Sequence, residues 1–96
     1  MTELTLLSSR KIPLKPLVEA AIHNELRILE SGIRRTNHTL QKLETQHDMT
    51  SDEFVRRYDQ NQMKETLEFA EWIGEYRLLK RLQEKEQTLR EVQFAD

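Results

Sequence analysis

The chain has 96 residues and a mass of 11.5 kDa, the size of one small domain. Charged residues make up 33% and hydrophobic residues 36%, so the chain is polar but carries enough apolar residues for a core. The absence of cysteine excludes disulfides, thiolate metal sites and cysteine nucleophiles. A formal net charge of −2 gives no overall attraction to nucleic acid or acidic lipid.

Glycine and proline are scarce, with two of each, and both prolines lie in the first sixteen residues. Sheet-rich folds need more turn residues than this, so the composition predicts an all-α protein. No apolar run approaches the roughly 18 residues of a membrane span. The N-terminus lacks a basic-then-apolar signal pattern, so we expect a cytoplasmic protein.

Residues 1–15 differ from the rest, and we expect them to form an extended or flexible N-terminal arm. Partial alternation of threonine and leucine after Met1 suggests a short extended segment. One interpretation is a partly ordered tail, and the other is an arm that lies along another chain. The second interpretation gives the arm a set of apolar partner-binding anchors: Leu4, Leu6 and Leu7, followed by Ile12 and Leu14.

Residues 16–96 are expected to form a helical hairpin domain. Pro16 suits the first position of a helix, and the helix continues to about His47. The apolar positions of this helix are spaced alternately by four and three residues, which is a heptad seam with Thr36 and His47 as its polar members. The seam consists of Ile22, Leu26, Leu29, Ile33, Thr36, Leu40, Leu43 and His47. Gly32, inside the run, suggests a close helix approach or a slight bend.

A short helix and a second long helix are predicted to follow. Thr50 and Glu53 have the spacing of a capping box, which predicts a helix over about residues 51–58. Asp59 then caps a third helix over about residues 61–90, matched in length to the first. Two long helices joined by a short one are typical of an antiparallel hairpin. Because two long helices expose more apolar surface than one hairpin buries, we expect either self-association or a foreign partner. A homo-oligomer of two hairpins would form a four-helix bundle.

The third helix shows a seam with a register slip. We predict that this seam comprises Met63, Leu67, Ala70, Gly74, Leu78, Leu82, Lys85, Leu89 and Val92. Further apolar residues lie beside the slip, namely Phe69, Trp72, Ile73, Tyr76 and Leu79. One interpretation places this aromatic patch in the hairpin or dimer core. The other makes it a partner-binding hot spot, since Trp and Tyr dominate such anchors.

The sequence contains few combinations of side chains that could form a catalytic or metal site. The serines lack a nucleophile-elbow motif, and two isolated glycines form no phosphate loop, so no enzyme is expected. Glu44 and His47 form one Glu-x-x-His pair, whereas di-iron bundles use two. Glu68 and Glu71 form one Glu-x-x-Glu pair, but the first helix offers no matching second pair for Mg²⁺. We therefore expect no catalytic residues, no metal and no cofactor, and we take Glu65, Glu68, Glu71 and Glu75 as an acidic outer face.

Small basic clusters occur at Arg34-Arg35, at Arg56-Arg57 and around Arg77, Lys80 and Arg81, each with acids nearby in sequence. The first helix has four acidic and four basic residues between Leu17 and His47 and is therefore neutral. Nucleic-acid readers carry a coherent basic face. The composition thus argues against nucleic-acid binding by this chain alone.

Three segments resemble a family of small prokaryotic helical proteins that are encoded beside genes for putative toxins. The segments are Leu29-Glu30-Ser31-Gly32-Ile33-Arg34-Arg35-Thr36, Met49-Thr50-Ser51-Asp52-Glu53-Phe54-Val55-Arg56-Arg57-Tyr58 and Glu71-Trp72-Ile73-Gly74-Glu75-Tyr76-Arg77-Leu78-Leu79. The resemblance covers roughly residues 16–94 and implies an antitoxin-like role with a cognate toxin as partner. No site residues come with it, and no ribbon-helix-helix or helix-turn-helix segment is evident. The alternative hypothesis is a homo-oligomeric coiled-coil scaffold or adaptor.

Overall fold

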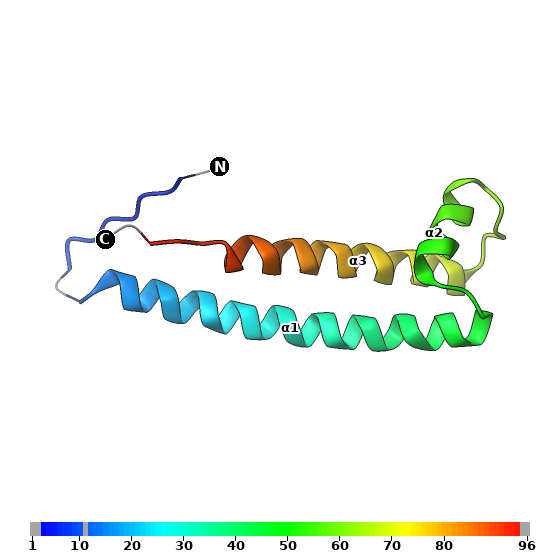
Figure 1. Ribbon diagram of the computed structural model, residues 1–96, viewed down its shortest axis with the longest axis horizontal. Helices are drawn as coiled ribbons and strands as arrows, with labels where there is room; N and C mark the ends of the chain where they lie inside the picture. The colour runs from blue at the N-terminus through cyan, green and yellow to red at the C-terminus, as the bar shows by residue number, and fades with distance from the viewer. Residues whose placement is uncertain (1–2, 11, 95–96) are drawn as a thin grey trace.

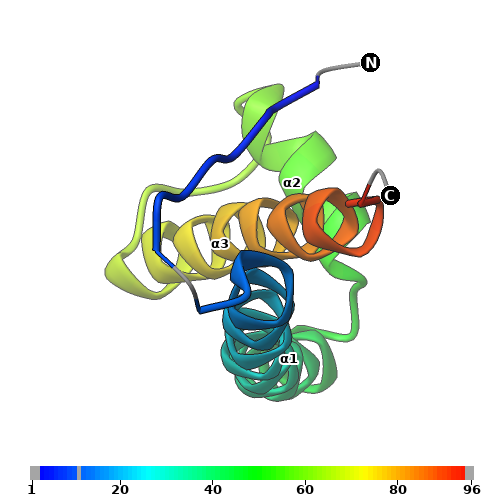
Figure 2. The same ribbon diagram turned by 90° about the vertical axis from the view of Figure 1, so that its left-hand side faces the viewer.

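The computed structural model describes residues 3–10 and 12–94 as three helices joined by short loops: α1 (Leu14–His47), α2 (Ser51–Asp59) and α3 (Leu67–Arg90). Figure 1 shows α1 and α3 side by side and antiparallel. The short α2 lies at one end, here called the closed end, and the N-terminal arm and the segment after α3 lie at the other, the open end (Figures 1 and 2). The predicted all-α hairpin with a short connecting helix is confirmed. Residues 1–2 and 11 of the expected arm, and 95–96 of the expected extended end, lie outside the described residues.

The ends of α1 follow simple backbone chemistry. The helix begins at Leu14 after Pro13, two residues earlier than expected, and Pro16 lies in the first turn, where a missing N–H is harmless. The helix ends at His47, as predicted. Asp48 then adopts a left-handed conformation with φ 49°, which its short polar side chain tolerates, and its N–H bonds back to the carbonyl of Glu44.

Half of the predicted capping box of α2 is confirmed, because the Thr50 hydroxyl accepts a hydrogen bond of 3.1 Å from the N–H of Glu53. The Glu53 carboxylate accepts instead from the side chains of Arg56 and Arg57. The expected start of the third helix is wrong. Asp59 is the last residue of α2, and the next N–H groups bond back to α2 carbonyls, so the chain turns through Asn61 at φ 57°. Helix α3 starts six residues later than expected, where the Thr66 hydroxyl accepts from the N–H of Phe69 at 3.1 Å.

The seam on α1 faces α3 as predicted, with each of its eight residues at least half-buried. Thr36 is only 1% exposed. A polar side chain is tolerated there because its hydroxyl donates to the Gly32 carbonyl at 2.8 Å. A Cβ at Gly32 would lie 3.3 Å from Cδ1 of Leu82. Gly32 therefore permits the close approach of α1 to α3.

The seam predicted on α3 is wrong at five of its positions. Leu67 is 78% and Val92 41% exposed, and Ala70, Gly74 and Lys85 are also exposed. The residues that turn inward are the aromatic patch and then the later leucines: Phe69, Trp72, Ile73, Tyr76, Leu79, Leu82 and Leu89. The heptad count started from Met63, which lies in the loop before α3 and has no bearing on the register of the helix.

The main core lies toward the closed end. Its buried members are Leu40, Phe54, Trp72, Ile73 and Leu79. Toward the open end, Leu29 is the buried hydrophobic residue of α1. The other side chains between α1 and α3 at this end are half-buried. Among the described helices, none combines the length and apolar character that a membrane span requires.

Candidate functional site

The N-terminal arm is an extended segment with exposed leucines. Its described residues form neither helix nor strand before α1. Leu4 is 81% exposed, Leu6 50% and Leu7 91%, and Ile12 is 61% exposed. The arm lies at the open end, away from α2 (Figure 1). The structure therefore keeps the predicted arm anchors apart from the predicted aromatic patch.

The aromatic patch is packed inside the closed end of the hairpin. The Trp72 ring stacks on Phe54 of α2, with ring centroids 3.8 Å apart and planes 4° apart. Phe69 meets Phe54 edge-on at 5.2 Å. Trp72 is 0% exposed, while Ile73 and Leu79 are buried and Phe69 and Tyr76 half-buried. In this single chain the five residues pack against the hairpin core, and contact with a partner protein stays a prediction.

Hydrogen bonds fix the position of Trp72. Its indole N–H donates to the hydroxyl of Ser51 at 2.9 Å, and the backbone N–H of Ser51 donates to Glu44 Oε2 at 2.8 Å. Neither Ser51 nor Phe54 was predicted from the sequence as a partner of Trp72. The available signal was their spacing of three residues, which places both on one face of α2.

Two tyrosines form hydrogen bonds on the surface of the closed end that connect α2 to its neighbours. The Tyr76 hydroxyl donates to Asp52 Oδ1 at 2.7 Å, and the Tyr58 hydroxyl donates to Glu65 Oε2 at 3.0 Å. Each hydrogen bond to a carboxylate favours the protonated phenol and is the main reason that the pKa of each tyrosine is raised. The bonds therefore hold α2 to α3 and to the loop that precedes it.

The candidate metal ligands are engaged in pairs. His47 Nε2 lies 2.5 Å from Glu68 Oε1, which joins the end of α1 to the first turn of α3. Glu44 accepts from Ser51, and Glu65 accepts from Tyr58. Within the described part of the chain, no three His, Asp or Glu side chains gather in an arrangement that would hold a metal ion.

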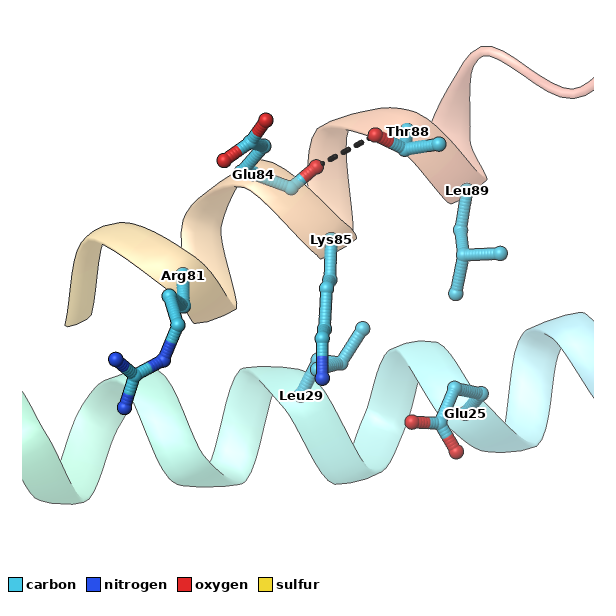
Figure 3. Close-up of a pocket in the computed structure, with 7 residues that line it drawn as sticks. All are labelled: Glu25, Leu29, Arg81, Glu84, Lys85, Thr88 and Leu89. Carbon is cyan, nitrogen blue, oxygen red and sulfur yellow. Dashed lines mark hydrogen bonds between the residues drawn. The ribbon is translucent and has the colours of Figure 1, made fainter. Parts of the chain in front are cut away.

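A shallow groove of about 530 Å³ lies between α1 and α3 toward the open end (Figure 3). Leu29 and Leu89 form its apolar part, and charged side chains border them: Glu25, Arg81, Glu84 and Lys85. Thr88 bonds to the backbone of its own helix, donating to the Glu84 carbonyl at 2.8 Å. Such a groove suits an apolar side chain flanked by charges, and the sequence analysis did not foresee it.

The chain matches no protein-family model, no curated protein and no solved structure at a significant level.

Proposed function

We propose that this chain is an antitoxin-like protein-binding module without chemistry of its own, which neutralises a cognate toxin by covering part of its surface. The observation that supports the proposal is the apolar N-terminal arm. Three leucines within four residues are 50–91% exposed in an extended segment. An extended apolar segment gains stability when a partner protein covers it.

The aromatic patch contributes to this function indirectly. With Trp72 and Phe54 fully buried against each other, the patch forms the core of the closed end. The arm, and the open end from which it emerges, then provide the contact surface. The resemblance to proteins encoded beside putative toxins supplies the class of partner.

The test is co-expression with the product of the adjacent gene. The intact chain is expected to co-purify with that protein and to relieve any toxicity it causes. A variant with Leu4→Ser, Leu6→Ser and Leu7→Ser is expected to lose both effects, because it removes the exposed apolar contacts of the arm.

The matched control changes exposed apolar residues of the helices that lie away from the start of α1. Ile28 and Leu67 are 57% and 78% exposed, so a variant with both replaced by serine makes a similar chemical change elsewhere. This control is expected to keep co-purification and rescue. Toxicity that is unchanged by co-expression of the intact chain contradicts the proposal, as does rescue by the arm variant.

The second candidate function is a homo-oligomeric scaffold, and an outward stripe on α3 favours it. Leu67 is 78% exposed, and it is followed on the same side by exposed Ala70 and Gly74. Apart from its sequence neighbours and the nearby backbone of α3 itself, no atom of the described residues lies within 4 Å of a Cβ built at Gly74. A second hairpin packed on this stripe would complete the four-helix bundle expected from the sequence.

Light scattering of the isolated chain separates the two functions. A scaffold gives a stable dimer or tetramer, and an antitoxin-like module without its partner does not require one. Tryptophan fluorescence does not separate them, because Trp72 is already 0% exposed within one chain.

A further inference from the structure

The outer face of α1 carries a basic stripe that the overall composition hides. From Arg27 to Thr45, steps of three and four residues keep the same side of the helix toward solvent. The members of this stripe are all exposed: Arg27, Ser31, Arg34, Arg35, His38, Gln41, Lys42 and Thr45. The stripe lies opposite the seam that faces α3, and in Figures 1 and 2 no other element covers that side of α1.

The acidic residues of α1 are turned away from this stripe. Glu30 pairs with Arg90 of α3, and Glu44 accepts from the backbone of Ser51. Glu25 lies in the groove between α1 and α3, and Glu19 lines a second pocket that the end of α3 and Phe94 share. Between Leu17 and His47, helix α1 is neutral in net charge, but its basic and acidic side chains therefore lie on different faces.

The four cations of the stripe are unpaired with carboxylates. Across residues 3–10 and 12–94, no ion pair involves Arg27, Arg34, Arg35 or Lys42. Arg27 donates to the amide oxygen of Asn24 at 3.0 Å. Four positive charges thus lie along residues 27–42 of the helix, a length of roughly 22 Å, and the one acidic residue in that range, Glu30, is paired with Arg90.

We propose that this stripe binds the sugar-phosphate backbone of double-stranded DNA without regard to base sequence. Arginine, lysine, serine, threonine and glutamine are the side chains that contact phosphate oxygens, and the stripe is composed of these types and one histidine. Protein interfaces are enriched in aromatic residues, methionine and arginine, and of these the stripe contains arginine but no aromatic residue or methionine. The groove of B-form DNA admits an α-helix, whereas the major groove of duplex RNA is too narrow for one.

The experiment is a fluorescence-anisotropy titration of the full chain against a labelled mixed-sequence DNA duplex of two helical turns, about 20 base pairs. Binding is expected at about 50 mM salt and should weaken steeply by about 200 mM. Four phosphate contacts predict a slope of log affinity against log salt of about −3 to −4. Absence of binding at the lower salt concentration overturns the proposal.

A matched pair of variants locates the binding surface. Arg34→Gln, Arg35→Gln and Lys42→Gln together should weaken binding at least tenfold and reduce the slope by about three. Arg77→Gln, Arg81→Gln and Lys85→Gln change three exposed cations of α3, so the net charge changes equally. The α3 variant is expected to keep most of the affinity. An equal loss in both variants, with helicity retained by circular dichroism, overturns the assignment to α1.

Two competitors test the identity of the ligand. An RNA duplex of the same sequence and poly-glutamate at equal charge are both expected to compete more weakly than the unlabelled DNA. Equal or stronger competition by the RNA duplex overturns the choice of DNA. Equal competition by poly-glutamate shows that the stripe accepts an acidic protein surface and also overturns the proposal.

Discussion

Trp72 is held on its face by the ring of Phe54 and at its edge by the hydroxyl of Ser51. Stacking and burial of two large rings supply apolar stabilisation, and the hydrogen bond satisfies the one polar atom of the indole. These contacts bring together α2 and α3, and the bond from Ser51 to Glu44 adds α1. One side chain thereby organises the closed end of the hairpin.

Removal of the Ser51 hydroxyl is expected to be costly. In Ser51→Ala the indole N–H of Trp72 remains buried without an acceptor, which should lower the free energy of unfolding by about 1–3 kcal/mol. Urea denaturation measures the change. Ser31→Ala, at an exposed position of α1, is the control and should change stability by less than about 0.5 kcal/mol. Equal values for the two variants would contradict this role of Ser51.

Glu53 gives α2 a defined response to acid. The pKa of Glu53 is lowered from 4.5 to about 2, first by its hydrogen bond to Arg56 and then by that to Arg57. A lowered pKa means that the stabilisation is present above pH 4.5 and is lost as the pH falls toward 2. In Glu53→Gln this part of the acid dependence should be absent, which melting curves over that range will show. Identical acid profiles for the two proteins would contradict the pairing.

At the scale of the helices, hydrophobic periodicity predicted that both long helices exist, but it predicted the buried face correctly only for α1. The seam of α1 was predictable because all eight of its positions keep a strict spacing and no other apolar stripe competes. On α3 two stripes compete, one through Leu67 and Gly74 and one through Trp72 and Tyr76. Single-helix periodicity does not choose between them, because the choice depends on Phe54 of α2 stacking on Trp72.

Two further features were not predictable from the sequence, namely the first residue of α3 and the role of the aromatic patch. Asp59 and Thr66 are both good caps, and the hydrogen bonds of the turn through Asn61 decide for Thr66. A patch rich in Trp and Tyr suits a core as well as an interface, so its composition left both interpretations open. Its burial follows from the placement of α2, a long-range contact that local patterns do not encode.

The two glycines give a test of helix packing. Gly74→Ala should raise the free energy of unfolding by about 0.5–1 kcal/mol, because alanine favours the helix and its Cβ meets open space. Gly32→Ala should gain less, since its Cβ would lie 3.3 Å from Leu82 and that side chain must shift. Thermal or urea unfolding compares the two variants. A loss of stability in Gly74→Ala would indicate that another chain covers this stripe in solution.

At the scale of the whole molecule, the arm is separate from the stability of the hairpin. A variant that lacks residues 3–9 should unfold within about 0.5 kcal/mol of the intact chain, because these leucines remain exposed. Phe94→Ser is the control, since that ring is half-buried and lies 5.7 Å from Nζ of Lys15. It should cost about 1 kcal/mol in urea denaturation. Strong destabilisation by the arm deletion would show that the arm packs against a hairpin.

The molecule measures 59 Å along its longest axis, and its buried aromatic side chains all belong to the cluster at the closed end. Local unfolding should therefore be more frequent at the open end, where the ends of α1 and α3 separate, than at the closed end. Amide hydrogen exchange should be fast near Pro16 and Arg90 and slow near Leu40 and Ile73. The open ends of α1 and α3 should therefore come apart as one local unit, while the aromatic cluster at the closed end keeps the two helices joined.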